Sequence, residues 1–427
     1  MRKRIPPASS VAGVVKVPGD KSISHRAVLL GAIAEGETRI LGLSTSADVR
    51  SSLRCVEALG VDVKKDGDVH VVRGRAGRFL PASGVLDAGN SGTTVRLLSG
   101  LLAGQPFETT LDGDASLRRR PMQRVMIPLA KMGATFRARE DQYLPLTVKG
   151  RRPLAAISYR LPVASAQVKS SILLAGLFAD GTTRVREIRR TRDHTERMLV
   201  AFGAQLEQRE LEISLSGPAL LRAAEVHVPG DPSSAAFLWA AAALFPGAQV
   251  TVREVGVNPT RVAFLDILAE MGARVTVENR SNQCGEPVAD VTVEGPHELR
   301  AIRISGEQVP LLIDELPLLA VLAAFARGTS EVSEAGELRV KESDRIATTA
   351  ANLQEIGAKI DERPDGWIIQ GTEEVVGGSV RSYGDHRIAM AMAIAGLRSR
   401  EGVEIDEAEC VDVSFPNFFE VLDELRQ

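Results

Sequence analysis

A short hydrophobic pattern recurs five times along the chain. In each copy an apolar helix end runs into a glycine, and alternating apolar and polar residues follow. Glycine just past a helix end is the usual left-handed terminator, and the alternation after it predicts a strand. Successive copies lie 69 to 85 residues apart, and their glycines are Gly60, Gly133, Gly203, Gly272 and Gly357.

A second series of segments interleaves with the first. Six times a small or acidic residue opens a helix rich in alanine and leucine, which ends near a glycine and leads into a strand rich in threonine and valine. Serine, asparagine and aspartate are favoured at helix N-caps, and proline fits the first helical turn. The six openings lie at residues 21–24, 90–93, 165–168, 231–234, 314–317 and 385–388.

Repeats of this length indicate one supersecondary unit copied several times. At 427 residues the chain is also too long for one hydrophobic core. Six copies, arranged as three plus three, predict an α/β fold of two similar domains. One domain is expected to comprise residues 20–229. The other is expected to combine residues 230–427 with residues 1–19, because a strand around residues 11–17 precedes the first copy.

Composition argues against several classes of protein. Aromatic residues make up 4% of the chain, so its cores must be built mostly from alanine, leucine, valine and isoleucine. A net charge of −3 argues against a general nucleic-acid binder. The apolar segments are shorter than the ~20 residues that span a bilayer, and three scattered cysteines fit a reducing compartment. We therefore expect a soluble, cytoplasmic protein that binds neither nucleic acid nor membrane and, lacking coiled-coil heptads, is a monomer.

The helix openings combine two features that indicate anion binding. A helix N-terminus presents unpaired N–H groups and a partial positive charge. Cations at such a position oppose the helix dipole unless an anion lies between them. A single charge run usually forms a solvated face, but repetition at equivalent positions favours a site for a small ligand with several negative charges. The cations at these openings are Lys21, Arg26, Arg96, Lys169, Arg387 and the neighbouring His386.

Four longer motifs include these openings: PGDKSISHR at 18–26, AGNSGTTVR at 88–96, VKESDR at 340–345 and GDHRIAM at 384–390. They resemble signatures of the 3-phosphoshikimate 1-carboxyvinyltransferase family, also called 5-enolpyruvylshikimate-3-phosphate (EPSP) synthases. The resemblance extends from about residue 10 to residues 414–420. It implies two similar domains, each of three βαβαββ repeats in an inside-out α/β barrel, which close around the ligands. It implies neither a metal nor an organic cofactor.

The reaction implied by the resemblance transfers the enolpyruvyl group of phosphoenolpyruvate to the 5-hydroxyl of shikimate 3-phosphate and releases phosphate. Such a reaction needs a general acid, a general base and stabilisation of negative charge. By resemblance, Glu342 is the acid/base at the methylene carbon and Asp314 is the base for the attacking hydroxyl. Lys21 stabilises charge or carries protons.

The resemblance also implies which residues hold each substrate. Those for shikimate 3-phosphate are Lys21, Ser22, Arg26, Ser165, Ala166, Arg192, Asp314 and Lys341. Those for phosphoenolpyruvate are Lys21, Gly92, Arg120, Gln167, Arg345 and Arg387. Supporting roles fall to Asn90, Thr93, Arg96, Lys169 and His386.

Other residues in these motifs have open or structural roles. His25, His194 and His386 each fit a structural hydrogen bond as well as a catalytic role. Asp344 and Glu196 are expected to orient neighbouring cations by ion pairing.

Further residues concern the branch of the family. Val413, Glu337, the SAQVK segment at 165–169 and the REVGVNPTR segment at 253–261 resemble the second, more glyphosate-tolerant class.

Two alternatives remain beside this interpretation. The related enzymes that act on UDP-N-acetylglucosamine usually carry a cysteine in the loop before an Arg-Pro motif, and residues 113–121 contain none. A non-catalytic anion-binding relative is expected to have lost a catalytic carboxylate, whereas Asp314 and Glu342 are both present.

Overall fold

The computed structural model describes residues 1–427, whose contacts divide them into two compact units. Unit 1 comprises residues 1–18, 230–281 and 287–427, and unit 2 comprises residues 19–229 and 282–286. The domains expected from the sequence, residues 20–229 and residues 1–19 with 230–427, do not separate the segment 282–286 from the residues around it. That segment is the tip of a β-hairpin, and a repeat pattern does not reveal where a hairpin tip packs. None of the helices has the length and apolar character needed to cross a membrane.

Unit 2 contains three sheets, and neighbouring strands within each sheet are hydrogen-bonded in the order given. The first is β15 (Glu225–His227), β3 (Glu37–Leu41), β5 (Val69–Arg73) and β4 (Asp62–Asp66). The second is β6 (Leu86–Asp87), β7 (Glu108–Asp112), β9 (Tyr143–Lys149) and β8 (Thr135–Arg139). The third is β10 (Leu154–Ala155), β12 (Ala179–Arg186), β14 (Glu212–Gly217) and β13 (Leu206–Arg209), with β11 (Ser158–Arg160) also paired to β12. Its helices are α1 (Lys21–Ile33), α2 (Ala47–Ala58), α3 (Gly92–Ala103), α4 (Gln123–Lys131), α5 (Ala166–Gly176) and α6 (His194–Ala201), with a 3-10 turn at Leu117–Arg119.

Unit 1 also contains three sheets. They are β17 (Arg274–Gln283), β18 (Glu286–Glu294), β16 (Gln249–Gly256) and β2 (Ala12–Val15); β19 (Arg303–Ile304), β20 (Thr329–Val332), β22 (Gly366–Gln370) and β21 (Lys359–Arg363); and β1 (Arg2–Ile5), β24 (Val403–Asp406) and β23 (Gly378–Arg381). Its helices are α7 (Pro232–Ala243), α8 (Ala263–Glu270), α9 (Gln308–Leu312), α10 (Leu316–Ala324), α11 (Arg345–Glu355), α12 (His386–Arg398) and α13 (Phe418–Leu425), with 3-10 turns at Gly336–Val340 and Ala408–Val413.

All six sheets share one pairing pattern. The central strand of each, which is β3, β7, β12, β16, β20 or β24, pairs in parallel with one neighbour. It pairs antiparallel with the neighbour on its other side. The six-fold repetition predicted from the sequence is therefore confirmed at the level of strand pairing. The sheets remain separate, and none closes into a barrel.

The parallel neighbours reveal an exchange of strands between the halves of the chain. Strand β2 precedes α1 in the sequence but pairs with β16 of unit 1. Strand β15 precedes α7 but pairs with β3 of unit 2. Each strand thus fills the position that the other would occupy in an unbroken repeat, so the chain crosses between the units once after β2 and once after β15.

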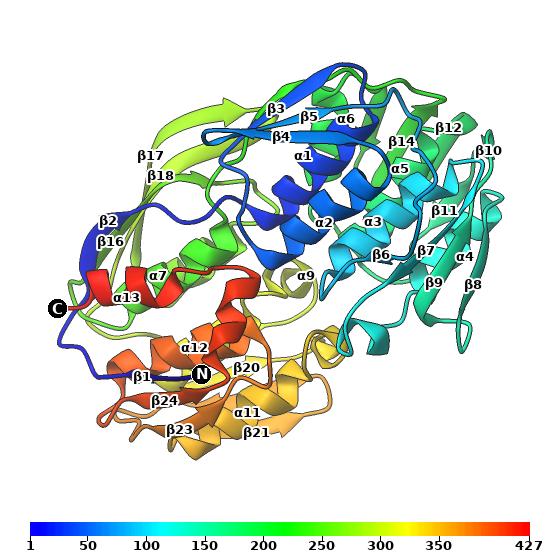
Figure 1. Ribbon diagram of the computed structural model, residues 1–427. Coiled ribbons are helices and arrows are strands. Elements are labelled where there is room, and N and C mark those ends of the chain that lie inside the picture. Colours follow the sequence, from blue (N-terminus) through cyan, green and yellow to red (C-terminus); the bar gives the residue numbers. More distant parts are fainter. The chain divides into compact units, whose positions relative to one another are not determined.

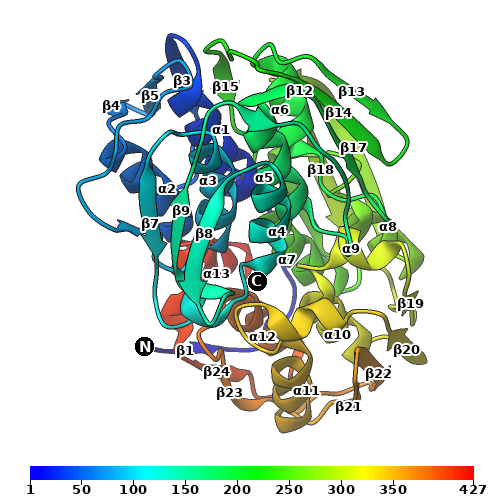
Figure 2. The ribbon, with the colours of Figure 1, turned by 90° about the vertical axis from the view of Figure 1, so that its right-hand side faces the viewer.

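Three nearly apolar helices lie inside each unit, and the sheets cover them (Figure 1). In unit 2 these are α1, α3 and α5, and Figure 2 shows α3 and α5 side by side. In unit 1 they are α7, α10 and α12, and every residue of α7 is buried. Small residues permit this packing: a Cβ atom at Gly100 of α3 would lie 2.3 Å from the carbonyl oxygen of Ser171 in α5.

The five helices that precede the recurring glycines, which are α2, α4, α6, α8 and α11, end as the sequence predicted. Their terminal glycines all have positive φ, between +82° and +107°. Left-handed backbone costs an L-residue with a side chain about 1–2 kcal/mol, and glycine avoids that cost. At Gly357, after α11, an added Cβ would make only ordinary contacts, the nearest at 3.4 Å from Val376. The loss of stability caused by a substitution there should therefore come from backbone strain alone.

Gly357→Ala should lower the free energy of unfolding by about 1–2 kcal/mol, because alanine pays the left-handed penalty. Gly371→Ala in the same repeat should cost more, since its Cβ would lie 1.5 Å from the carbonyl oxygen of Ala326. Urea denaturation followed by tryptophan fluorescence reports the unfolding of unit 1, which contains both buried tryptophans of the chain, Trp239 and Trp367. Equal losses in the two variants would contradict a rigid approach of the backbones at Gly371.

A chain of hydrogen bonds joins three helices of unit 2 near their N-termini. His25 Nδ1 in α1 lies 2.8 Å from Ser52 Oγ in α2, and Ser52 Oγ lies 2.8 Å from Thr94 Oγ1 in α3. Thr94 Oγ1 donates to Oγ of Ser91, the N-cap of α3, over 2.8 Å. All four residues are buried. The chain fixes the openings of α1 and α3 relative to each other.

Burial lowers the pKa of His25 well below its ordinary value, and the charge of Lys21 lowers it further. The folded protein therefore keeps His25 neutral at a pH where the unfolded chain binds a proton, below about 6.5. Because the unfolded state then binds more protons, stability should fall as the pH decreases below that value. This residue alone contributes up to about 1.4 kcal/mol per pH unit.

His25→Asn should remove this part of the pH dependence, because the asparagine amide does not titrate and can still bond Ser52. The free energy of hydrogen exchange of the α1 amides, corrected for intrinsic rates, should be compared between about pH 5 and 7. Identical slopes for the wild type and the variant would contradict a neutral, buried His25.

Candidate functional site

The six inner helices begin where the sequence predicted, and five of them have side-chain caps. Asp20, Ser91, Ser165, Asp231 and Asp385 each accept a hydrogen bond from a backbone N–H in the first turn. The sixth, α10, follows Glu315 without such a cap. The polar groups of both units collect at these openings.

In unit 2, Lys21 is the first residue of α1, a position that opposes the helix dipole. Its Nζ donates to Oδ2 of Asp48 in α2 over 3.0 Å. The carboxylate of Asp48 is nearly buried and orients the ammonium group. The sequence did not single out Asp48, because an acidic residue in the first turn of a helix is ordinary.

Gly92 begins α3 between two guanidinium groups. A Cβ at this position would lie 3.3 Å from Nη1 of Arg96 and 3.6 Å from Nη1 of Arg120. Arg120 Nη2 also donates to Oδ1 of Asn90 over 2.8 Å. The glycine leaves both cations beside the N–H groups of the first turn, which is suitable geometry for a phosphate.

Gln167 connects the openings of α3 and α5. Its Oε1 accepts a hydrogen bond from Arg96 Nη1 over 2.5 Å, and its Nε2 donates to Thr93 Oγ1 over 3.0 Å. Ser165, just before it, caps α5 by accepting from Val168 N. The structure therefore brings together the residues that the sequence assigned to a phosphate from two separate motifs.

Arg26 lies deeper in α1, beneath the opening. Its Nη1 donates to the carbonyl oxygen of Ser22 over 2.8 Å, and its other nitrogens donate to buried hydroxyls. Burial lowers the pKa of Arg26 to about 10, with Glu196 opposing the decrease. The guanidinium remains charged at neutral pH. Ser22 and Ala166 lie half-buried at the openings of their helices, and Arg192 is half-buried in the loop before α6.

Lys169 differs from the role expected of it. Its side chain is 0% exposed, and its Nζ lies 2.6 Å from Glu196 and 3.0 Å from Glu187. Its charge is directed to these carboxylates and not to an anion at the helix opening. Helical spacing alone did not reveal this, because the residue is near the N-terminus of α5 but on its inward side. The expected ion pair of Glu196 is confirmed.

In unit 1, Arg345 lies at the centre of a cluster of carboxylates. The side chain is 1% exposed and donates from Nε and Nη2 to the two oxygens of Asp385, over 2.8 and 3.1 Å. Nη2 also donates to Glu342 over 2.8 Å, and Nη1 to Asp314 over 3.4 Å. Burial disfavours the charge, but Asp385 and Glu342 outweigh it and raise the pKa of Arg345.

The two outer carboxylates of this cluster are accessible, whereas the inner one is not. The side chains of Asp314 and Glu342 are 17% and 21% exposed, and that of Asp385 is 0% exposed. Burial tends to raise the pKa of Asp385, but Arg345 overrides this and lowers it. Asp385 thus holds the arginine, and the two carboxylates beside it remain open to a ligand. The sequence noted Asp385 only as a helix opening.

Arg387 and Lys341 complete the cluster. Arg387 lies 3.4 Å from Oε1 of Glu315 and 3.8 Å from Oδ2 of Asp314. Burial lowers the pKa of Lys341, with Asp314 opposing the decrease and Arg345 adding to it. Lys341, Glu342, Arg345 and Arg387, from the motifs at 340–345 and 384–390, therefore lie together with Asp314. Glu315 was not predicted, because neither the helix opening nor the resemblance gave a role to the carboxylate next to Asp314.

The remaining motif residues have partners of their own. His194 Nδ1 lies 2.7 Å from Oε1 of Glu286 within unit 2, and both are buried. Asp344 caps α11 and accepts from Arg339 over 2.8 Å, as expected of a residue that orients a cation. His386 is buried in the first turn of α12.

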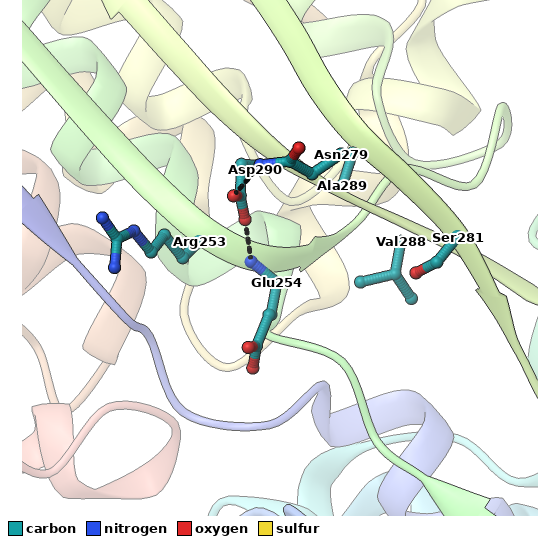
Figure 3. Close-up of a pocket in the computed structure, with 7 residues that line it drawn as sticks. All are labelled: Arg253, Glu254, Asn279, Ser281, Val288, Ala289 and Asp290. Atoms are coloured by element: carbon teal, nitrogen blue, oxygen red, sulfur yellow. Dashed lines mark hydrogen bonds between the residues drawn. The ribbon is translucent and has the colours of Figure 1, made fainter.

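A polar hollow of about 400 Å³ lies away from these clusters, on strands β16 to β18 (Figure 3). Its carboxylate, Asp290, accepts from Asn279 Nδ2 and from the backbone N–H of Glu254, each over 2.8 Å. These hydrogen bonds lower the pKa of Asp290. Because no candidate residue lines it, the hollow is not the candidate site.

Comparisons with known proteins agree with this arrangement of residues. A family model described as EPSP synthase (3-phosphoshikimate 1-carboxyvinyltransferase) matches residues 5–422. Proteins named 3-phosphoshikimate 1-carboxyvinyltransferase from Desulforudis audaxviator and Gloeobacter violaceus are each 51% identical to the chain. The first match covers 100% of both chains, and the second covers 99% of this chain and 98% of its relative.

A solved structure, the EPSP synthase from Acinetobacter baumannii, has the same fold. It is 42% identical in sequence and superposes with a TM-score of 0.88, covering 100% of this chain and 98% of that one. Similarity of this extent, in sequence and in structure, shows that the chain belongs to the EPSP synthase (3-phosphoshikimate 1-carboxyvinyltransferase) family.

Proposed function

We propose that this chain transfers the enolpyruvyl group of phosphoenolpyruvate to the 5-hydroxyl of shikimate 3-phosphate and releases phosphate. The observation that carries the proposal is the meeting of two accessible carboxylates, Asp314 and Glu342, at the buried Arg345. Enolpyruvyl transfer needs a proton donor and a proton acceptor beside a group that binds an anion, and Glu342, Asp314 and Arg345 can fill these three roles. The names of the full-length relatives support the same reaction.

The chemistry follows from these groups. Glu342 protonates the methylene carbon of phosphoenolpyruvate, and Asp314 accepts the proton of the attacking hydroxyl, which forms the new C–O bond. Glu342 then removes a proton from the resulting methyl group as the C–O bond to phosphate breaks. The cationic intermediate that precedes attack is stabilised by nearby carboxylates, while arginines hold the substrate carboxylate. Arg345 and Arg387 have the planar guanidinium groups suited to bidentate contacts.

Unit 2 supplies the groups for the phosphates in this proposal. Arg120 and Gln167, beside Gly92, receive the phosphate of phosphoenolpyruvate, and Lys21 balances its charge. Ser165, Arg26 and their neighbours hold shikimate 3-phosphate, together with Lys341 of unit 1. The guanidinium groups beside the first turn of α3 support this assignment, because helix N–H groups and arginine together favour a phosphate.

A phosphate-release assay tests the proposal. Chelator-treated protein should release phosphate from phosphoenolpyruvate when shikimate 3-phosphate is present and remain inactive with UDP-N-acetylglucosamine. Release with the nucleotide sugar alone would favour the related enzyme class, and release with neither would favour an anion-binding relative.

Glu342→Gln should reduce turnover by at least ~100-fold, because an amide cannot transfer the proton that general acid–base catalysis requires. Binding of shikimate 3-phosphate, measured by calorimetry, should persist, since Asp385 still holds Arg345. The matched control is Glu355→Gln, the same change at an exposed residue of the same unit. Turnover within a few-fold of wild type in Glu342→Gln would exclude Glu342 as the acid/base.

The assignment to the second, more glyphosate-tolerant class belongs to this proposal as well. It rests on Val413, Glu337 and the SAQVK and REVGVNPTR segments. Turnover with increasing glyphosate would test it, and inhibition at concentrations typical of the sensitive class would overturn it. We further propose a cytoplasmic monomer, which size-exclusion chromatography with light scattering can test for its oligomeric state.

A further inference from the structure

Unit 2 contains a buried group of charges that the proposed reaction does not use. Lys169 of α5 lies between Glu187, which follows β12, and Glu196 of α6, at 3.0 and 2.6 Å. We call these three residues the lysine–glutamate cluster. Their side chains are 0%, 1% and 3% exposed. A buried ion pair is a weak source of stability, because desolvation offsets most of the attraction. The cluster is more informative because it fixes the positions of the segments that carry its three residues.

The cluster connects both ends of the loop that carries Arg192. This loop, residues 187–193, joins β12 to α6. Glu187 at its start accepts a hydrogen bond from the Thr191 hydroxyl near its end. Glu187 N also donates to the carbonyl oxygen of Leu211 over 2.8 Å. Thr191 is buried and directly precedes Arg192, so the cluster determines where the backbone of Arg192 lies.

A second contact lies beside the cluster and leads to Arg26. Ser170 follows Lys169 on α5 and Thr195 precedes Glu196 on α6, and their hydroxyl oxygens are 2.6 Å apart. We call them the hydroxyl pair. Arg26 Nε donates to Thr195 over 2.6 Å and Nη2 to Ser170 over 2.8 Å. The guanidinium plane is therefore held by two helices that the cluster joins.

The charges in this region support a positional role. Burial tends to lower the pKa of Lys169, but Glu196 and Glu187 overcome it and raise that pKa. Burial raises the pKa of Glu187, and Lys169 opposes the increase. Lys169 therefore stays charged. If either glutamate moved away from it, that carboxylate would be buried without a partner.

We propose that the lysine–glutamate cluster and the hydroxyl pair are positioning residues for Arg26 and Arg192. This inference rests on the proposed function, in which both arginines hold shikimate 3-phosphate. Lys169 then acts on this substrate only through other residues. Displacing a positioned cation should weaken the binding of one substrate and leave the acid/base groups of unit 1 unaltered.

The test uses isosteric changes that remove single hydroxyls. Thr195→Val removes the acceptor of Arg26 Nε, and Thr191→Val removes the hydrogen bond that closes the loop. Each should raise the KM for shikimate 3-phosphate about tenfold, because misplacement of a binding group by a fraction of an ångström has effects of this order. The KM for phosphoenolpyruvate and kcat should remain within about threefold of wild type.

Matched controls separate positioning from stability. Thr183→Val is the same change at a buried threonine of unit 2 whose hydroxyl has no hydrogen-bond partner. It should leave both KM values unchanged. Thr195→Ser keeps the hydroxyl and should restore most of the affinity. Calorimetric binding of shikimate 3-phosphate without phosphoenolpyruvate should show the same order of variants as the KM values.

Two results would overturn the inference. One is a KM for shikimate 3-phosphate in Thr191→Val and Thr195→Val that matches that of Thr183→Val. The other is an equal rise in both KM values. If Thr195→Val does not fold, Thr191→Val decides the question, because its side chain lies in a loop and not between helices. A wild-type protein inactive with shikimate 3-phosphate would refute the proposed function itself, which is a distinguishable result.

Discussion

The inner helices are apolar on almost every side, and this constraint determines where polar chemistry can occur. All residues of α7 and α10 are buried, and α12 is exposed only at its last residue. Such helices expose almost no side chains along their length, so charged side chains reach a ligand mainly near their ends. The N-terminal ends also present backbone N–H groups and a partial positive charge. Caps, cations and catalytic carboxylates consequently gather at a few openings.

The two units use these openings differently. In unit 2, Arg96 and Arg120 donate to the neutral amides of Gln167 and Asn90. In unit 1, Arg345 and Arg387 each contact carboxylates. A cation with amide neighbours retains its attraction for a phosphate, whereas arginines among carboxylates form a nearly balanced cluster. Unit 2 therefore keeps cations available for an anion, whereas unit 1 holds carboxylates in place beside its arginines.

Much of the fold could be predicted from the sequence, since helix caps, glycine terminators and alternating strands are local signals. The repeats even placed the strand at residues 12–15 in unit 1. Side-chain partners could not be predicted, because they depend on which face of a helix turns inward. Lys169 shows this clearly: its position near a helix N-terminus suggested a ligand, but its side chain ends between two buried glutamates.

Two charged residues were missed for a related reason. Asp48 and Glu315 stand at ordinary positions near helix starts, and only their distances to Lys21 and Arg387 mark them. The packing of the hairpin tip at 282–286 could not be predicted either, because its interactions with α6 join segments far apart in the chain, such as Arg197 and the carbonyl oxygen of Gly285. Local sequence carries no information about such distant contacts.

The exchange of strands has a consequence for the order in which the chain can fold during synthesis. Apart from the short segment 282–286, unit 2 is one continuous stretch, so it can form soon after residue 229 leaves the ribosome. Unit 1 must wait, because β2 needs β16 and β1 needs β24, which begins at Val403. Its first residues remain without partners while most of the protein is made. Strand β1 is thus synthesised before all of unit 2 and is among the last strands to find a partner.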